Sequence, residues 1–255
     1  MIRNCLLAAA AAAMLTASAD AAPVPATVKA ALSDAARPDA DVKRDADRKP
    51  AAMLAFAGIR PGLRVMDLTP GGGYFTRIFA KAVAPNGYVY AYQPTELDHF
   101  FKDKEPPIVA VAAAYPNVSV IHASVNTLTA PESLDVVWTS QNYHDLKDDL
   151  FKPADTALVN KAIFNALKPG GLYIILDHSA PTGSGVSDTD TLHRIDEAVV
   201  KKEVEAAGFK LIGESNVLRN PKDPRTVKVF DPSIRGHTDQ FILKFRKPLR
   251  AGGHS

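Results

Sequence analysis

Three consecutive glycines, Gly71 to Gly73, follow a short apolar run that contains Asp67, and they precede residues with helical spacing. This order is typical of a strand, a tight turn and a helix. A glycine has no Cβ, so a ligand can approach the main chain of such a turn closely. The helix that follows presents unpaired N–H groups and a partial positive charge, which favour a carboxylate or a phosphate. The turn is therefore a candidate ligand cradle, although a tight turn without a ligand can show the same residues.

Two histidines stand next to carboxylates in the second half of the chain. His144 precedes Asp145, and His178 follows Asp177 at the end of a continuous apolar run. A histidine with a pKa near neutrality can accept a proton in catalysis, and a neighbouring carboxylate can orient it. On an extended segment, however, adjacent side chains point to opposite faces. His144 therefore fits a structural role as well as that of a base, and Asp177 and His178 fit the capping of a loop as well as a site.

Two further histidines lie later in the chain. If His144, His178, His193 and His237 met around one pocket, their imidazoles could bind a metal. Their spacing matches no metal-binding motif, so we predict no metal site. We expect some of these side chains to contact an anionic or hydroxylated small molecule instead. The residues predicted to bind such a substrate are Asp145, His193, Arg235 and His237.

Alternating strands and helices would position these residues. Seven runs are predicted to be strands, at 64–68, 88–93, 117–122, 134–139, 172–177, 209–214 and 240–245. Helices are predicted between them, at about 74–83, 96–114, 151–167 and 196–207. Strands and helices that alternate at this spacing predict an α/β fold with a doubly wound, mostly parallel sheet and helices on both faces. The last strand is expected to return antiparallel.

Three other segments bear on the site. The segment 41–57 alternates charges before an apolar end, and we predict a helix that is kinked near Pro50 and has its charged half in solvent. The connections 179–192 and 219–239 are unusually long, and loops of that length are often functional. Both leave the carboxyl ends of strands, where open α/β sheets bind their ligands. They are therefore placed to roof a pocket.

Length and composition fit a single domain. The chain has 255 residues, of which 46% are hydrophobic, and this is enough for one sizeable α/β core. The formal net charge of +2 favours neither a nucleic-acid surface nor an acidic partner. We predict a loose lead-in at 22–40, one domain at 41–247 and a tail at 248–255.

The first 21 residues differ from the rest. Arg3 precedes an apolar run at 6–15, and small residues follow it, in the order of a secretory signal peptide. An uncleaved anchor is the alternative, but the run is shorter than the roughly 20 residues that span a bilayer. The only cysteine, Cys5, lies inside this segment, so the mature chain can form no disulfide. We therefore expect a cleavable signal peptide at 1–21, export to the periplasm and no stable membrane insertion afterwards.

From about residue 40 to residue 247, the pattern resembles the class I S-adenosylmethionine-dependent methyltransferases. More closely, it is similar to a family of exported methyltransferase-like proteins that share the phrases DLTPGGGYFT, QNYHDL, LDHSAPTGSG, DTLHRID and FDPSIRGHTDQF. The first phrase falls on the motif D-x-G-x-G-x-G, in which Asp67, Gly71 and Gly73 match and Thr69 replaces the first glycine. The resemblance implies a Rossmann-like seven-stranded fold, S-adenosylmethionine as cofactor and a small-molecule methyl acceptor.

The resemblance also implies roles for residues at the strand ends. Gln93 stands where the family has an acid that binds the ribose hydroxyls, with Glu96 three residues on, and Ser124 stands near the adenine position. The segment after the fourth strand lines the acceptor pocket and lacks the N-P-P-Y form that serves bases, so nucleic acid is not expected as a substrate. The cofactor-binding residues implied are Asp67, Thr69, Gly71, Gly72, Gly73, Tyr74, Gln93, Ser124 and Asn142, and the catalytic candidates are Tyr143, His144 and His178.

Two other interpretations fit parts of the sequence. A nicotinamide-dependent oxidoreductase would have glycine or alanine where Thr76 stands and an acid where Gln93 stands. A P-loop is excluded because no Gly-Lys-Ser/Thr sequence follows the glycines. An exported, non-catalytic binding protein on the same fold fits the signal peptide and the replaced positions Thr69, Gln93 and Ser124. We expect a methyltransferase, with the binding protein as the alternative and the NAD(P)-dependent oxidoreductase third.

Overall fold

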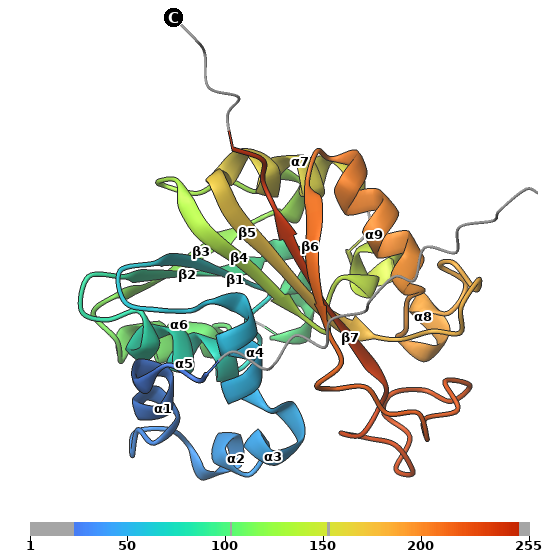
Figure 1. Ribbon diagram of the computed structural model, residues 1–255, viewed down its shortest axis with the longest axis horizontal. Coiled ribbons are helices and arrows are strands. Elements are labelled where there is room, and N and C mark those ends of the chain that lie inside the picture. The colour runs from blue at the N-terminus through green and yellow to red at the C-terminus, as the bar shows by residue number, and fades with distance from the viewer. Residues whose placement is uncertain (1–22, 103, 152–153, 250–255) are drawn as a thin grey trace, which may run out of the picture.

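The structure, a computed structural model, describes residues 23–102, 104–151 and 154–249. The predicted signal peptide at 1–21, with Cys5, lies outside these residues, as does most of the predicted tail at 248–255. Within the described ranges, no helix is both long enough and apolar enough to cross a bilayer. The described chain folds around a seven-stranded sheet with helices on both faces (Figure 1).

The sheet has the strand order β3-β2-β1-β4-β5-β7-β6. All neighbouring pairs are parallel except those that β7 forms with β5 and β6, so the predicted mostly parallel sheet with an antiparallel last strand is confirmed. The strands are β1 (Arg64–Leu68), β2 (Tyr88–Pro94), β3 (Val118–Ala123), β4 (Leu134–Ser140), β5 (Leu167–His178), β6 (Lys210–Ser215) and β7 (Gln240–Arg246).

Helices cover the two faces of the sheet and form a separate apolar core on each. Successive strand residues point to opposite faces, so Val65 of β1 packs into one core and Met66 into the other. One face carries α1 (Ala26–Leu32), α4 (Pro50–Ala57), α5 (Tyr74–Ala82) and α6 (Pro107–Ala113), and the other carries α7 (Thr156–Ala166) and α9 (Glu197–Ala206). Short 3-10 helices follow the strands: η1 (Thr95–Phe100), η2 (Val125–Thr127), η3 (His144–Lys147) and η4 (Asp149–Phe151).

The strand order reverses between β1 and β4, which are neighbours in the sheet. Leu68 at the end of β1 lies beside Thr139 of β4, so the glycine turn and the segment after β4 emerge next to each other. Open α/β sheets bind ligands at such a switch point, outside the carboxyl ends of the strands. The fold therefore brings the glycine turn and the segment after β4, which contains His144 and Asp145, to the same edge of the sheet.

The charged segment before β1 folds over this edge. It forms α2 (Asp39–Val42) and α3 (Asp45–Arg48), and the predicted break precedes α4, which begins at Pro50. The prediction that its charged half lies in solvent holds only in part: Lys43, Arg44, Asp47 and Lys49 are exposed, whereas Asp41, Asp45 and Arg48 are partly buried. Asp41 pairs with Arg77 at 2.9 Å, and the Arg48 guanidinium lies 4.5 Å from the centre of the Tyr74 ring. Partners on α5, far along the chain, hold these charges against the protein.

The two long connections pack against each other. The first contains α8 (Thr189–Leu192) and ends at Arg194, which is fully buried. The Nη1 and Nη2 atoms of Arg194 donate to the two carboxylate oxygens of Asp223 in the second connection, at 2.7 and 3.1 Å. Nη1 also donates to the carbonyl of Ser179. One buried ion pair thus ties both connections to the carboxyl end of β5.

Candidate functional site

The turn after β1 presents main chain to open space. Gly71 and Gly72 are exposed, and a Cβ built on either would meet no atom within 4 Å. Gly73 serves a different purpose: it has φ +79°, and a Cβ there would lie 2.9 Å from a methyl group of Val111 in α6. No side chain caps the start of α5, which begins directly after Gly73. The first N–H groups of this helix are therefore directed at the space outside the turn.

Thr69 adopts the backbone conformation that a glycine would supply. Its φ is +60°, in the left-handed region, where a residue with a Cβ costs about 1–2 kcal/mol. Its N–H donates to the carbonyl of Tyr92 at 2.9 Å, and its own carbonyl accepts from Nδ2 of Asn142 at 3.4 Å. The turn therefore keeps the shape expected of the glycine motif despite the replacement, and Asn142 links it to the end of β4.

Asp67 lies beneath the turn and is buried. Its Oδ2 accepts from the Thr76 hydroxyl at 2.6 Å. Burial raises the pKa of Asp67 to about 7, because the hydrogen bond from Thr76 and the charge of Arg48 offset only part of the lost solvation. The carboxyl group thus fixes the first turn of α5 from inside the protein.

The residues predicted to hold the adenosyl part lie at the ends of β2 and β3. Gln93 is 1% exposed, and its Nε2 has a long contact of 3.3 Å with the carbonyl of Pro94. Glu96 accepts from the Ser124 hydroxyl at 2.6 Å and from the Val125 N–H at 3.1 Å. A carboxylate and an amide therefore stand near the turn, and the carboxylate is held by the start of the segment after β3.

Tyr74 points toward α3. Its hydroxyl donates to Asp45 at 2.6 Å, and its ring lies under the guanidinium groups of Arg44 and Arg48, at 5.3 and 4.5 Å from the ring centre. Cation–π contacts of this length are attractive. Tyr74, expected to contact the cofactor, is thus part of the support for two arginines at the rim of the site. Phe75 packs in the core instead, 4.9 Å from the Trp138 ring.

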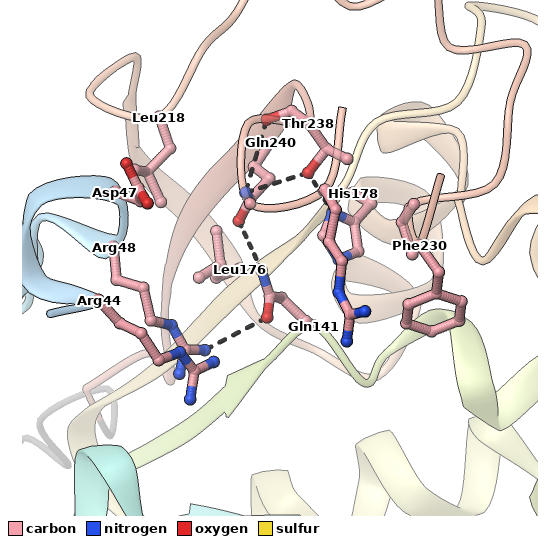
Figure 2. Close-up of a pocket in the computed structure, with 13 residues that line it drawn as sticks. Arg44, Asp47, Arg48, Gln141, Leu176, His178, Leu218, Phe230, Thr238 and Gln240 are labelled. Carbon is pink, nitrogen blue, oxygen red and sulfur yellow. Dashed lines mark hydrogen bonds between the residues drawn. The ribbon is translucent and has the colours of Figure 1, made fainter. Parts of the chain in front are cut away.

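A pocket of about 430 Å³ opens at the carboxyl ends of β4 and β5 and at the start of β7 (Figure 2). The second long connection, 219–239, roofs it, since Val229, Phe230 and Arg235 line it, whereas no residue of the first, 179–192, is among the lining residues. Pockets of about 300–1,000 Å³ are typical of small-molecule sites. The pocket thus has the size and the place expected of a substrate site in this fold.

Three arginines give the pocket a positive lining: Arg44, Arg48 and Arg235. Nη2 of Arg48 donates to Ser140 and Gln141 at 3.2 and 3.3 Å. Burial, with a contribution from the like charge of Arg44, lowers the pKa of Arg48 to about 10, and it remains charged at neutral pH. In the part of the chain that the structure describes, none of the three arginines pairs with a carboxylate. Asp47 also lines the pocket, but three arginines against one carboxylate leave the lining positive, which favours an anion.

A chain of hydrogen bonds crosses the pocket floor from Arg48 to His178 (Figure 2). Gln141 accepts from Arg48 and donates to Gln240 at 3.0 Å, and Gln240 donates to the hydroxyl of Thr238 at 3.2 Å. The hydroxyl lies 2.7 Å from Nδ1 of His178. The Thr238 hydroxyl, which accepts from Gln240, has one hydrogen to donate, and donation to Nδ1 leaves the proton of the neutral ring on Nε2. Burial lowers the pKa of His178 to about 3.

His144 is enclosed by two carboxylates. Its Nδ1 lies 2.8 Å from Asp177 and its Nε2 lies 3.0 Å from Asp145. Burial alone would lower the pKa of His144, but the charges and hydrogen bonds of the two carboxylates raise it well above its usual value. The ring is therefore an imidazolium at neutral pH. The expectation that His144 or His178 has a pKa near neutrality is wrong. Two carboxylates contact the His144 ring, whereas the His178 ring is buried against the hydroxyl of Thr238.

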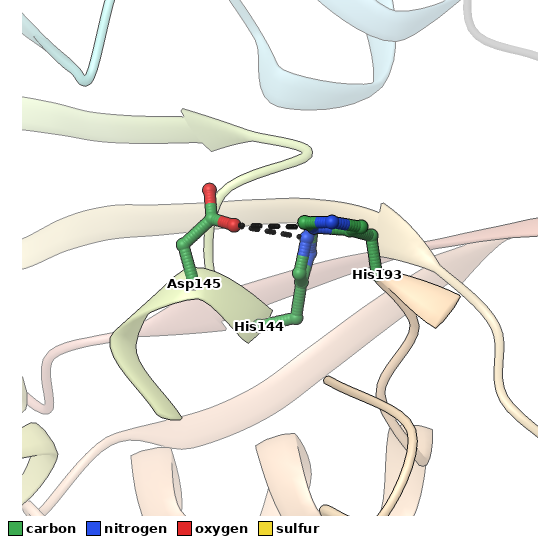
Figure 3. A group of neighbouring side chains, drawn as sticks. All are labelled: His144, Asp145 and His193. Atoms are coloured by element: carbon green, nitrogen blue, oxygen red, sulfur yellow. Dashed lines mark ion pairs between the residues drawn. The ribbon is translucent and has the colours of Figure 1, made fainter. Parts of the chain in front are cut away.

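The expectation of an extended segment at His144 and Asp145 is also wrong. The segment is the 3-10 helix η3, in which the His144 ring reaches the Asp145 carboxylate at 3.0 Å. His193, at the end of α8, completes the group: its Nδ1 lies 3.9 Å from the same oxygen of Asp145 (Figure 3). His237 neither joins it nor lines the pocket: its Nδ1 lies 3.7 Å from Asp47 and its side chain is 66% exposed.

Tyr143, predicted as a catalytic candidate, lies in the core below α7 and α9. Its hydroxyl accepts from Asn160 at 2.8 Å and donates to Glu203 at 3.0 Å. It does not line the pocket. The resemblance made it a catalytic candidate, but its hydroxyl is bound by Asn160 and Glu203 away from the pocket.

Several lining residues were not predicted: Arg44, Arg48, Leu218, Val229, Phe230, Thr238 and Gln240. The spacing of Arg44 and Arg48 by four residues was the available signal, because it places two like charges on one side of a helical segment. The others come from an irregular loop and from the start of a strand, where periodicity gives no orientation.

Comparisons with known proteins agree with this arrangement. No protein-family model matches the chain. It is 27% identical over 195 residues to the ubiquinone/menaquinone biosynthesis C-methyltransferase UbiE of Pseudomonas paraeruginosa, over 75% of this chain and 65% of that protein. The chain thus spans about two thirds of the length of the curated relatives that it matches.

Two solved structures show the same fold. The 1,6-didemethyltoxoflavin-N1-methyltransferase of Burkholderia thailandensis, solved with 1,6-didemethyltoxoflavin and S-adenosylhomocysteine, gives a TM-score of 0.55 at 18% identity, over 82% of this chain and 81% of that chain. The [4+2]-cyclase SpnF gives a TM-score of 0.56 at 17% identity, over 80% of this chain and 81% of that chain. At this identity the likeness concerns the fold, and the second case shows that one fold can serve another reaction.

Proposed function

We propose that this chain, which has the fold of the class I S-adenosylmethionine-dependent methyltransferases, binds S-adenosylmethionine at the turn after β1 and methylates a small acidic molecule in the neighbouring pocket. One observation carries this proposal. The main chain of Gly71 and Gly72 faces open space, and Asn142 and Arg48 stand between that turn and the arginine-lined pocket. A donor and an acceptor bound at these two places would be neighbours.

The turn fits the amino-acid end of the donor. The N–H groups at the start of α5 favour a carboxylate, and the Arg48 side chain, which contacts Ser140 at the end of β4, adds a positive charge on the same side. Gln93, at the end of β2, is buried and would contact the ribose only after its amide turns outward. When bound, the sulfonium supplies an electrophilic methyl group, and the protein's part is to align it with the acceptor.

The pocket fits an acceptor that is bound as an anion. Arg44, Arg48 and Arg235 would stabilise a carboxylate, a phenolate or an enolate, while Val229 and Phe230 would contact apolar parts. Neither buried histidine can take a proton readily, because His144 is already protonated and His178 is a very weak base. An acceptor that enters without its acidic proton needs no such base. The related UbiE protein is a C-methyltransferase, and a carbon acceptor of this kind is included in the proposal.

Isothermal titration calorimetry of the purified chain with S-adenosylmethionine, S-adenosylhomocysteine and NADH tests the proposal against its alternatives. Binding of the first two and not of NADH is the expected result. Binding of NADH alone would favour the oxidoreductase, and no binding of any of the three would favour the non-catalytic binding protein.

Export is part of the proposal. The segment 1–21 has the sequence order of a cleavable signal peptide. Expression of the full chain, separation of the periplasmic fraction and N-terminal sequencing test it. A new N-terminus near residue 20 or 22 is expected, whereas a full-length chain that stays inside the cell would contradict export.

A further inference from the structure

We propose that His144, Asp145 and His193 bind a divalent transition-metal ion beside the pocket. Figure 3 shows that one carboxylate oxygen of Asp145 faces both imidazole rings. One ligand atom from each of the three residues can be chosen so that all lie within 4.8 Å of one another. The residues come from two separate segments, η3 and the end of α8, which the fold brings together at the carboxyl edge of the sheet.

The distances between the ligand atoms suit a shared ion. Atoms bound at about 2.0–2.1 Å from a zinc-like ion in a tetrahedral arrangement are about 3.3 Å apart. Nε2 of His144 lies 3.0 Å from Oδ1 of Asp145, and Nδ1 of His193 lies 3.9 Å from the same oxygen. A small rotation of the His193 side chain, which is 27% exposed, would close the difference. The ion would take the place of the proton between His144 and Asp145.

A buried carboxylate orients the central ligand. Asp177 lies 2.8 Å from Nδ1 of His144, so that Nε2 is the nitrogen turned toward Asp145 and His193. Histidines that bind metals in proteins commonly donate their other ring N–H to a carboxylate in this way. The backbone N–H groups of His144 and His178 also donate to Asp177, each at 2.8 Å. The ring is thus held in a ligating orientation from behind.

The donor set indicates the class of ion. Two imidazoles and one carboxylate suit Zn²⁺, Co²⁺, Fe²⁺ or Mn²⁺, whereas Mg²⁺ and Ca²⁺ prefer oxygen ligands alone. Three protein ligands leave coordination positions for water or for another molecule. This differs from the sequence-based prediction, which excluded a metal because no spacing motif is present.

The group lies against the wall of the pocket. Phe230, which lines the pocket, packs 5.0 Å from the ring centre of His193, and His178, which also lines it, lies 6.2 Å from the ring centre of His144. An ion here would therefore stand within reach of a ligand that extends past Phe230. The metal site is independent of the proposed function. Only a contact between the ion and an oxygen of the methyl acceptor would rest on the proposed function.

Titration of the chelator-treated full chain with Co²⁺, followed by calorimetry and by visible absorption, tests the inference. We expect one equivalent to bind, with absorption bands of a low-coordinate cobalt site. His193→Ala and Asp145→Asn should each weaken binding at least about tenfold. The matched control is His237→Ala, which removes an exposed histidine outside the group and should leave binding unchanged. Circular dichroism and thermal unfolding of each variant show whether it is folded.

Two outcomes would overturn the metal site: no Co²⁺ binding to the wild-type chain, or an affinity that folded His193→Ala and Asp145→Asn variants retain. Titration of the same proteins with S-adenosylhomocysteine keeps this result separate from the proposed function. Binding of Co²⁺ without binding of S-adenosylhomocysteine would support the metal site and contradict the methyltransferase. Binding of S-adenosylhomocysteine without binding of Co²⁺ would support the methyltransferase and contradict the metal site.

Discussion

Asp177 contacts His144 twice, since its Oδ2 accepts from the backbone N–H of His144 at 2.8 Å and its Oδ1 lies 2.8 Å from Nδ1 of the ring. Asp177 is the last residue but one of β5 and His144 begins η3 after β4, so one carboxylate joins the ends of two neighbouring strands. The contact fixes the position of the 3-10 helix as well as the state of the ring. It is the point at which the geometry of the site depends most on a single pair of residues.

The first prediction concerns the protonation of His144. In metal-free protein, ¹⁵N NMR of the imidazoles should show His144 as an imidazolium at pH 7, because Asp177 and Asp145 raise its pKa well above the usual value. Its raised pKa contributes stability that is complete below about pH 6.5 and is lost as the pH rises through the folded-state value. His178, whose pKa burial lowers to about 3, should stay neutral at pH 5 and is the internal control. A neutral His144 at pH 7 would contradict the assignment.

The second prediction concerns the carboxyl group below the glycine turn. Burial raises the pKa of Asp67 from its usual value to about 7, so the folded state binds a proton that the unfolded state releases between about pH 4 and pH 7. The stability from this group is therefore complete below about pH 4 and is lost as the pH rises to about 7. Asp67→Asn stays neutral, so its thermal midpoint should fall less between pH 4.5 and 7.5 than that of the wild type. Parallel curves for the two proteins would show that Asp67 ionises normally.

The third prediction concerns the strained residue of the turn. Thr69 has φ +60°, so Thr69→Gly should remove the left-handed strain of about 1–2 kcal/mol, offset by about 0.4–1 kcal/mol because glycine makes the unfolded chain more flexible. We expect the free energy of unfolding to rise by about 1 kcal/mol or less. Thr69→Ala is the matched control, because alanine keeps the strain and should not stabilise. Urea denaturation measures both, and a loss of stability in the glycine variant would refute the explanation.

The fourth prediction concerns the ion pair that ties the long connections. Arg194 and Asp223 are both fully buried at their side chains and lie 2.7 Å apart. Arg194→Met would leave a buried carboxylate without its partner, and the free energy of unfolding should fall by about 3–5 kcal/mol. Lys168→Ala removes an ion pair whose lysine side chain is 38% exposed, and it should lower the free energy by less than about 1 kcal/mol. Equal effects in urea denaturation would mean that the buried pair does not hold the connections.

Much of the fold follows from local pattern. The continuous apolar run at 172–177 predicted a strand buried on both faces, and it lies between β4 and β7 within β5. The glycine turn predicted a strand, a bend and a helix, and the structure has β1, the turn and α5. These features depend on neighbours in the sequence, so residue spacing is enough to predict them.

The positions and pKa values of the site residues depend on partners that are distant in the sequence, and residue spacing does not reveal these partners. Arg48 was predicted to lie in solvent with the other charges of its segment, but contacts with Tyr74 and Gln141 hold its side chain at the pocket. His144 fitted a structural role as well as that of a base, yet Asp177, more than thirty residues later, acts with Asp145 to raise its pKa against the effect of burial. A contact between segments that the fold brings together cannot be predicted from the residues adjacent to either segment.

The affinity for S-adenosylhomocysteine of two glycine variants tests the central claim most directly, namely that the turn after β1 holds the donor. Gly71 and Gly62 both have a left-handed φ, +55° and +84°, and a Cβ on either meets no atom within 4 Å. Gly62 lies before β1, at the opposite edge of the sheet, so Gly62→Val carries the same backbone strain without entering the cradle. Calorimetry should show binding by the wild type and by Gly62→Val, and at least about a tenfold loss in Gly71→Val. Equal affinity in the two variants, or no binding by the wild type, would contradict the claim.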